Sequence, residues 1–169
     1  MLRLLVPTLC LLALPAQAQK RPHLCASGET PAFSCATGRK VASLCATSDA
    51  DGATSALTYR FGTPKTLELT YPEAGVRPAE AFQRGVTGAT GGGAEFLRFA
   101  IGDTRYVLYS DYYRGHESDG IVIERAGKPR LSLRCRGPAL DGREGWSRVY
   151  KAGLPNTAEP FDVPGVSGR

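Results

Sequence analysis

Apolar and polar residues alternate in short segments through most of this chain, and this pattern limits the folds open to it. In residues 67–71, Leu67, Leu69 and Tyr71 alternate with Glu68 and Thr70. Further segments with the same period are 57–61, 97–101, 121–123 and 131–135. A period of two places the apolar side chains of a strand on one face, and glycine, proline and aspartate separate the segments as turns require. We therefore expect an all-β fold of about eight antiparallel strands, in a small meander barrel or sandwich.

Helix is expected only over Pro78–Phe82, where one helical turn can form, because no other segment has a convincing helical period. Beyond Gly137 the chain becomes polar and rich in proline and glycine. We expect Trp146, Val149 and Tyr150 to pack back on the β domain, and the chain after Pro155 to form a mobile tail.

The N-terminus has the features of a secretory signal peptide. Arg3 supplies a positive charge, Leu4–Leu14 is apolar, and Ala16-Gln17-Ala18 has the small-x-small form of a cleavage site. A membrane anchor is the alternative, but the apolar run is shorter than the roughly 18 residues that a span needs. We expect a periplasmic or secreted protein with no transmembrane segment. Its predicted parts are a signal peptide (1–18), an N-terminal arm (19–31), a β domain (32–150) and a flexible C-terminal tail (151–169).

The charge of the processed chain is mildly positive. Removal of residues 1–18 takes away one basic residue and leaves 20 basic and 16 acidic residues, a net charge of +4. The basic residues are scattered among acidic ones and form no stripe with interleaved aromatic residues. Nucleic acid is therefore not an expected partner.

Four cysteines remain after removal of the signal peptide: Cys25, Cys35, Cys45 and Cys135. An even number in an exported chain predicts disulfides, and no C-x-x-C spacing suits a metal or redox site. We expect neither a metal nor a cofactor. Three pairings of the four are possible. In a hairpin turning at Gly38, Cys35 and Cys45 lie about 13 Å out of register, so a bridge between these two is the least expected. Of the two pairings that remain, we favour Cys35–Cys135 with Cys25–Cys45.

Residues 85–94, "GVTGATGGGA", form the most glycine-rich segment. It is not a phosphate cradle, because it lacks the Gly-Lys-Ser/Thr ending and no helix is expected after it. Two interpretations remain: a flexible loop presented to a partner at the rim of the β domain, and an ordinary solvent loop between strands.

Residues 109–120, "YSDYYRGHESDG", combine tyrosines with ionisable side chains. Their spacing matches no metal loop, and no serine or cysteine nucleophile motif accompanies His116. A polar connection between strands is one interpretation. The other is a recognition surface that includes Tyr112 and Tyr113, because tyrosine is favoured where proteins bind partners.

The order of these segments resembles that of a known family. A Phe-x-Cys strand (33–35), Tyr-Arg-Phe-Gly (59–62), Leu-x-Leu-x-Tyr (67–71), a glycine-rich loop and a last strand ending in Cys135 are similar to the periplasmic MliC/PliC and PliI lysozyme inhibitors. Uncharacterised exported bacterial β proteins also resemble this chain. The inhibitor resemblance implies a loop that enters a lysozyme cleft. Its place here is 90–96, with Thr90 where the family has serine and Phe96 where it has tyrosine.

We therefore expect a binding protein rather than an enzyme, with a lysozyme or another envelope protein as partner. The expected contact residues are Thr90, Gly91, Gly92, Gly93, Glu95, Tyr112 and Tyr113. One alternative is a cell-envelope interaction or structural protein with no enzyme target, including a homodimer through an edge strand. Another is a small hydrolase that uses His116 with Asp111 or Asp119.

Overall fold

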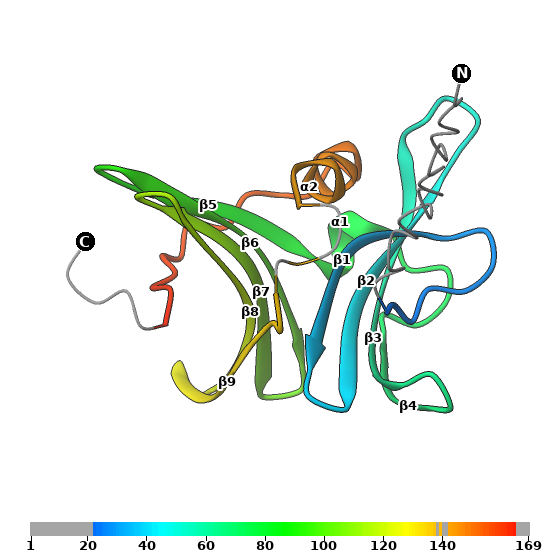
Figure 1. The fold of residues 1–169 in the computed structure, drawn as a ribbon. Helices are drawn as coiled ribbons and strands as arrows, with labels where there is room; N and C mark the ends of the chain where they lie inside the picture. The colour runs from blue at the N-terminus through cyan, green and yellow to red at the C-terminus, as the bar shows by residue number, and fades with distance from the viewer. Residues whose placement is uncertain (1–21, 138, 140–141, 165–169) are drawn as a thin grey trace, which may run out of the picture.

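The structure is a computed structural model, and it describes residues 22–137, 139 and 142–164. The expected signal peptide, 1–18, lies outside the described residues. Among the described residues, nine strands form two antiparallel sheets that face each other (Figure 1). The first sheet has the order β1-β2-β3-β4, and its strands are β1 (Thr30–Thr37), β2 (Lys40–Ser48), β3 (Thr54–Thr63) and β4 (Thr66–Tyr71).

The second sheet also follows chain order. Its strands are β5 (Gln83–Ala89), β6 (Gly92–Ile101), β7 (Thr104–Tyr113), β8 (His116–Arg125) and β9 (Lys128–Arg134). A single helical turn, α1 (Pro78–Ala81), precedes β5, and a longer helix, α2 (Gly142–Lys151), follows β9. The expected all-β fold with antiparallel strands is confirmed, as a sandwich and not a closed barrel. The helical turn expected over Pro78–Phe82 is also present.

Aromatic side chains from both sheets join the two layers of the sandwich. The rings of Tyr71, Phe99 and Tyr106 stack in sequence, with centroids 4.7 and 4.9 Å apart. Phe82 meets Tyr71 and Phe99 edge-on, and Tyr59 tilts against Phe99. Such stacked and edge-to-face pairs add to the gain from burying the rings. Tyr59, Tyr71 and Phe99 are apolar positions of the alternating segments, so the face that those segments mark is the inner one.

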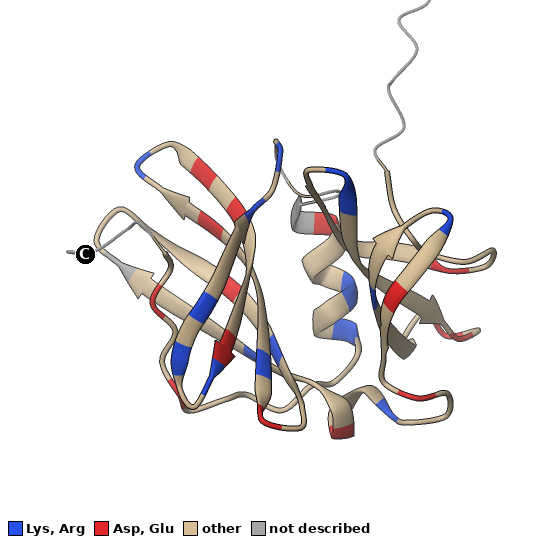
Figure 2. Ribbon diagram, turned by 90° about the horizontal axis from the view of Figure 1, so that it is seen from below, with Lys and Arg blue, Asp and Glu red and all other residues tan. Residues whose placement is uncertain are grey.

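Helix α2 was not predicted from the sequence. It lies between the two sheets at one end of the molecule (Figures 1 and 2) and packs mainly against β1. Trp146 and Val149, three residues apart, are buried in the core. Gly145 faces the Ala32 carbonyl oxygen so closely that a Cβ there would overlap it. Glycine lowers intrinsic helix propensity, so the local sequence did not indicate a helix here. The helix forms because its apolar face is buried.

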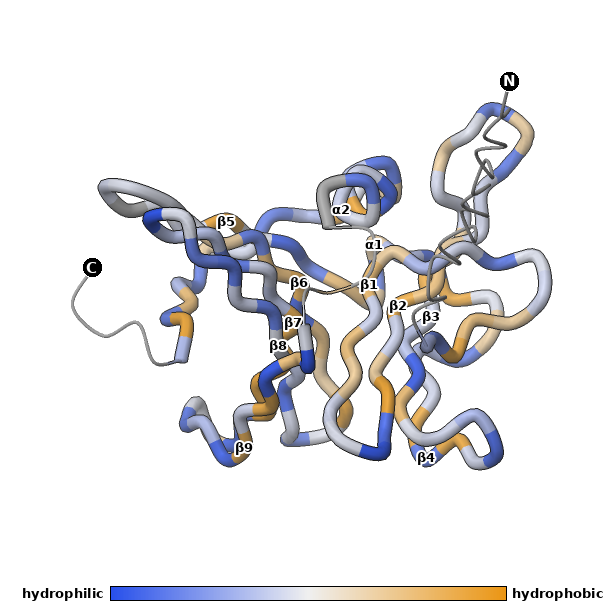
Figure 3. The backbone as a smooth tube through the Cα atoms, in the orientation of Figure 1, coloured by the Kyte–Doolittle hydropathy of each residue, from blue (hydrophilic) through white to orange (hydrophobic). Residues whose placement is uncertain are grey.

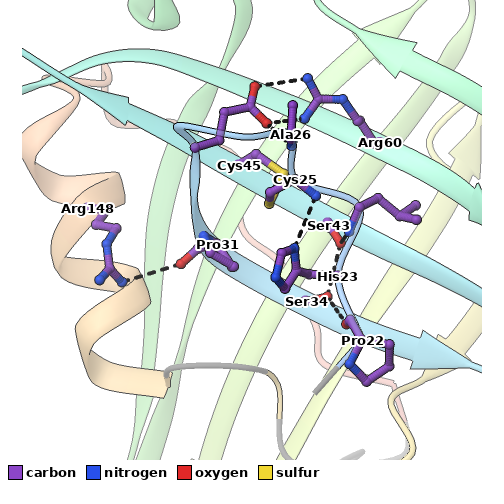
Figure 4. The surroundings of a disulfide bond; sticks show 12 residues. Pro22, His23, Cys25, Ala26, Pro31, Ser34, Ser43, Cys45, Arg60 and Arg148 are labelled. Carbon is purple, nitrogen blue, oxygen red and sulfur yellow. Dashed lines mark hydrogen bonds and ion pairs between the residues drawn. A yellow bond between two sulfur atoms is a disulfide. The ribbon is translucent and has the colours of Figure 1, made fainter. Parts of the chain in front are cut away.

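The outer face of the first sheet is covered by the N-terminal arm (Figure 4). The Cys25–Cys45 disulfide ties the arm to β2. Ser34 donates to the Pro22 carbonyl oxygen at 2.9 Å, and the Arg60 guanidinium donates to both carboxylate oxygens of Glu29 at 2.5 and 2.9 Å. Cys35–Cys135 joins β1 to the end of β9, so both disulfides are the pairs favoured from the sequence.

The outer face of the second sheet is covered by residues 155–163. Phe161 and Val163 are buried with Phe96 and Tyr109 of the sheet. The buried Arg98 guanidinium donates to the Pro160 carbonyl oxygen at 3.2 Å and pairs with the Glu159 carboxylate at 3.1 Å. The tail expected over 151–169 therefore belongs to the packed structure as far as Val163. Its last five residues lie outside the described part of the chain.

Each sheet has one edge strand with a neighbouring segment bonded to it and one edge strand that is largely exposed. The edge of β1 is occupied where Arg136 donates its N–H to the Ala36 carbonyl oxygen, and that of β5 by Pro155 and Thr157. Strands β4 and β9 are the remaining edges, and most of their residues are exposed. Neither helix among the described residues has the length and apolar character needed to cross a membrane.

Candidate partner-binding surface

The glycine-rich segment is a paired hairpin and not a flexible loop, which corrects the sequence interpretation. Residues 83–89 form β5 and residues 92–101 form β6, so only Thr90 and Gly91 remain in the turn. A Cβ at Gly92 would overlap the Tyr112 carbonyl oxygen, and one at Gly93 would overlap the Thr87 carbonyl oxygen. These glycines therefore allow close approach of neighbouring backbones.

The tyrosine-rich segment forms the neighbouring hairpin, β7–β8. Gly92 lies opposite Tyr113 and Gly93 lies opposite Tyr112. Arg114, at the second turn, has φ 49 and donates its backbone N–H to the Gly91 carbonyl oxygen at 2.9 Å. The two segments identified separately in the sequence therefore form one structure, a double-hairpin tip that projects from the body of the sandwich (Figure 1).

The register of the sheet assigns the residues of the tip to its two faces. Val86 lies opposite Glu95, and Tyr112 lies opposite Gly93, two residues from Glu95. Side chains two residues apart share a face, so Val86, Glu95 and Tyr112 point to the same side. That side is the inner one, toward α2. We call the set Arg84, Val86, Glu95, Tyr112 and Tyr150 the tip face.

Tyr150 of α2 completes the tip face and is held in place from two sides. Its hydroxyl donates to Glu95 Oε1 at 2.8 Å, and the Arg84 guanidinium lies 4.6 Å from the centroid of its ring. Partial burial, followed by the hydrogen bond to Glu95, raises the pKa of Tyr150. The ring stays 41% exposed. A tyrosine that is both fixed and exposed loses little conformational entropy when it binds a partner.

An open cavity of about 400 Å³ lies beside Tyr150, between β6 and α2. Its lining residues are Glu95, Trp146, Ser147, Tyr150 and Lys151. Val86 and Tyr112, which are 64% and 54% exposed, lie on the same face of the sheet as Glu95, on the two strands that flank β6. Large exposed side chains around a concavity are typical of binding sites and are not explained by the packing of the domain.

The tip face has acidic surroundings although the whole chain is basic. Glu117 lies opposite Tyr112, and Asp119 lies opposite Ser110, so both follow Glu95 on the inner side of the sheet. Among the described residues, Arg84 and Lys151 place basic side chains at this surface. The net positive charge of the chain is therefore a poor guide to the electrostatic potential at the tip face.

Tyr113 does not join the tip face. It alternates with Tyr112 along β7 and points to the other side of the sheet, where the Arg114 guanidinium lies 5.2 Å from the centroid of its ring. Thr90 is exposed in the turn at the end of the tip. Of the predicted contact residues, the structure thus brings Glu95 and Tyr112 together on one face. Gly92 and Gly93 supply the close strand pairing that supports them.

His116 and Asp119 of the hydrolase hypothesis occupy opposite faces of β8, because they are three residues apart on one strand. The Asp119 carboxylate accepts the Ala139 N–H at 2.6 Å. Asp111 shares the outer side with His116, but it is buried and lies opposite Ser118. The side chains of His116 and Asp119 are therefore not positioned to work together as a catalytic pair.

One group of metal-type ligand atoms occurs among the described residues, formed by Cys25, Cys45 and Glu29. The two sulfurs are joined in a disulfide and the carboxylate is paired with Arg60 (Figure 4). These atoms serve to fix the N-terminal arm in the oxidised protein.

Sequence reasoning missed Arg84, Val86 and Tyr150 as members of the tip face. Tyr150 lies 55 residues beyond Glu95 in the chain, and no local spacing links the two. Residues 83–89 show no period-two alternation and their glycines suggested a loop, so the sequence carried no signal for Arg84 or Val86.

Comparison with known proteins adds no further information about this site. A scan against protein-family models finds no match, and searches of curated proteins and of solved structures find no significant similarity. The class that the fold defines is a two-sheet, disulfide-bonded antiparallel β sandwich.

Proposed function

We propose that this chain is an exported binding protein that engages a macromolecular partner through the tip face. The observation that supports the proposal is that exposed Val86 and Tyr112 share one face with Glu95, which together with exposed Tyr150 lines the hollow. Central aromatic side chains commonly carry most of the affinity of an interface. The two disulfides suit an oxidising compartment outside the cytoplasm.

The target that we propose to test first is a muramidase, on the strength of the resemblance to the lysozyme inhibitors. The contact would differ from the inserted loop that the resemblance implies. A rigid double hairpin, with its two turns joined by the Arg114–Gly91 hydrogen bond, would dock beside the catalytic cleft. Carboxylates at Glu95 and Glu117 would favour the approach of a basic lysozyme, although the net charge of the inhibitor is positive.

The test is a titration of the oxidised, processed protein against c-, g- and i-type lysozymes in a cell-wall lysis assay. For a class that is inhibited, Tyr112→Ala should raise the inhibition constant about 30-fold, as loss of a hot-spot residue does. Leu67→Ala is the matched control, because Leu67 is 49% exposed on β4 and lies outside the tip face. Circular dichroism verifies that both variants fold.

Two outcomes would contradict different parts of the proposal. Equal inhibition by Tyr112→Ala and Leu67→Ala would overturn the assignment of the tip face. Absence of inhibition for all three classes would overturn the muramidase target. In that case, capture from envelope extract, with Tyr112→Ala as the negative control, would test whether another partner uses the same face.

The envelope-protein alternative has its own supporting observation, the two exposed edge strands β4 and β9. Strand edges with unpaired backbone groups can join further chains. Sedimentation of the processed protein over a range of concentrations tests this alternative: a dimer that resists dilution supports it, and a monomer throughout opposes it.

A further inference from the structure

A second cavity, of about 290 Å³, lies between the two sheets and plays no part in the tip face. The first sheet contributes Tyr59, Phe61, Glu68 and Leu69, and the second contributes Tyr106, Ile121, Ile123, Leu131 and Leu133. Leu131, on edge strand β9, is 47% exposed. The cavity is therefore walled by both layers of the sandwich and can be reached from solvent beside β9.

The lining of this cavity is almost wholly apolar. Glu68 is its one charged side chain, and its carboxylate is paired with Lys40 Nζ at 2.6 Å. Lys40 Nζ also lies 5.4 Å from the centroid of the Phe61 ring. Such walls favour a hydrocarbon portion of a ligand, because binding removes the apolar surface of both the cavity and the ligand from water.

The volume restricts the size of that hydrocarbon. At about 30 Å³ for each small group, the cavity holds roughly ten non-hydrogen atoms. This is a medium-length alkyl chain, or the terminal part of a longer one. It is at the lower limit of the volumes found for small-molecule sites, which begin at about 300 Å³.

The hairpin turns near the cavity indicate the charge of the ligand's head. The turns of β1–β2, β3–β4, β6–β7 and β8–β9 lie at one end of the molecule, away from the tip (Figure 1). In or beside them are the basic residues Arg39, Lys40, Lys65, Arg105, Arg125 and Lys128, and the acidic residues Glu68, Asp103 and Glu124. Figure 2 views the protein from this end, and Figure 3 shows its turns as largely hydrophilic. The three acidic residues are paired with Lys40, Arg125 and Arg105, so positive charge is in excess.

We propose that the cavity binds the alkyl chain of a single-chain anionic amphiphile, of the fatty-acid anion class, with its carboxylate among the basic turns. The aromatic and branched side chains of both sheets would enclose the chain. The basic turns would hold the head where it remains in contact with water. This site lies at the opposite end of the second sheet from the tip face and is independent of the partner that the tip face binds.

The test is isothermal titration calorimetry of the processed, delipidated protein with decanoate below its micelle concentration. A dissociation constant on the order of 10 µM is expected for a chain of this length. Decanol and decyltrimethylammonium are matched ligands that keep the chain and change the head. We expect decanoate to bind most tightly and the cation least, with the preference reduced at high salt.

Two variants connect the binding to this cavity. Leu131→Trp fills the mouth of the cavity at an exposed position and should weaken decanoate binding at least about tenfold. Val76→Trp places the same side chain at another exposed apolar position, 37% exposed and outside the cavity lining, and should leave binding unchanged. Circular dichroism of both variants verifies folding.

Three results would overturn the proposal. The first is equal decanoate affinity in the two tryptophan variants. The second is no heat of binding up to millimolar decanoate. The third is flotation of the protein with anionic vesicles that Leu131→Trp does not reduce, in a protein that does not bind free decanoate. The basic turns would then serve to attach the protein to a membrane surface through charge, and not to hold the head of a bound ligand. Loss of lysozyme inhibition or of partner capture would not bear on these measurements.

Discussion

Substitution of Phe161 by alanine tests whether the C-terminal segment belongs to the core. The ring is 4% exposed, and its centroid lies 5.2 Å from that of Phe96 and 5.6 Å from that of Tyr109. Phenylalanine-to-alanine changes in cores cost about 3–5 kcal/mol. Because this segment lies outside the helices and strands and can relax, we expect the lower limit, about 3 kcal/mol. For a domain of this size that lowers the melting temperature by roughly 6–12 °C.

The assay is urea denaturation of the oxidised protein followed by far-ultraviolet circular dichroism. Phe161→Leu keeps most of the buried volume and should cost less than about 1.5 kcal/mol. Asp162→Ala, at the next and exposed position, should change the unfolding free energy by less than about 0.5 kcal/mol. If Phe161→Ala behaved like Asp162→Ala, the segment would contribute nothing to stability, and the assignment of Phe161 to the core would be refuted.

Three further predictions concern the tip, the arm and the inter-sheet bridge. Gly92→Ala should destabilise the protein by more than about 2 kcal/mol, because a Cβ there overlaps a neighbouring backbone, whereas Gly88→Ala meets open space and should be near neutral in the same urea assay. The hydrogen bond from Arg60 lowers the pKa of Glu29 in the folded protein. The ionised carboxylate therefore stabilises the fold at pH values above about 4.3, the pKa of glutamate in the unfolded chain. This stabilisation is lost as the pH falls through the lower pKa of the folded state. Unfolding free energies measured from about pH 6 to about pH 3 should therefore fall more steeply in the wild type than in Glu29→Gln, and parallel curves would contradict the coupling. Replacing both cysteines of the Cys35–Cys135 disulfide by alanine, which opens a separation of 100 residues, should lower the unfolding free energy by about 4.7 kcal/mol. The same change at Cys25–Cys45, with its separation of 20, should lower it by about 3.3 kcal/mol. A larger loss for Cys25–Cys45 in thermal denaturation would contradict the entropic argument.

The strands of the sandwich could be predicted from the sequence because period-two alternation is a local property. Leu97 and Phe99 were expected on one face against Arg98, and both lie in the core between the sheets. Strand β5 escaped detection because its glycines suggest a loop. One of them, Gly85, lies directly beneath the Phe96 ring, where a Cβ would overlap the aromatic atoms. A glycine covered by a cross-strand aromatic ring is a paired position in a sheet, and only the partner strand reveals it.

The candidate site was predicted in pieces. Glu95 and Tyr112 were identified from separate segments, and the sheet register places them on one face. Tyr150 was expected only to pack against the β domain, and it instead donates a hydrogen bond to Glu95 while much of its ring stays exposed. Its role depends on helix α2, in which Gly142 and Gly145 lower the intrinsic helix propensity.

The sequence by itself determined the all-β class, the inward side of most strands and, among the disulfide pairings, that Cys35–Cys45 was the least expected bridge. These follow from side-chain alternation and from the reach of a disulfide, both of which act over short distances or strict geometry. Only the tertiary structure decided where α2 lies, that Phe161 covers the second sheet, and that two hairpins and Tyr150 form one face. Those features depend on contacts between residues far apart in the chain, where burial outweighs local propensity.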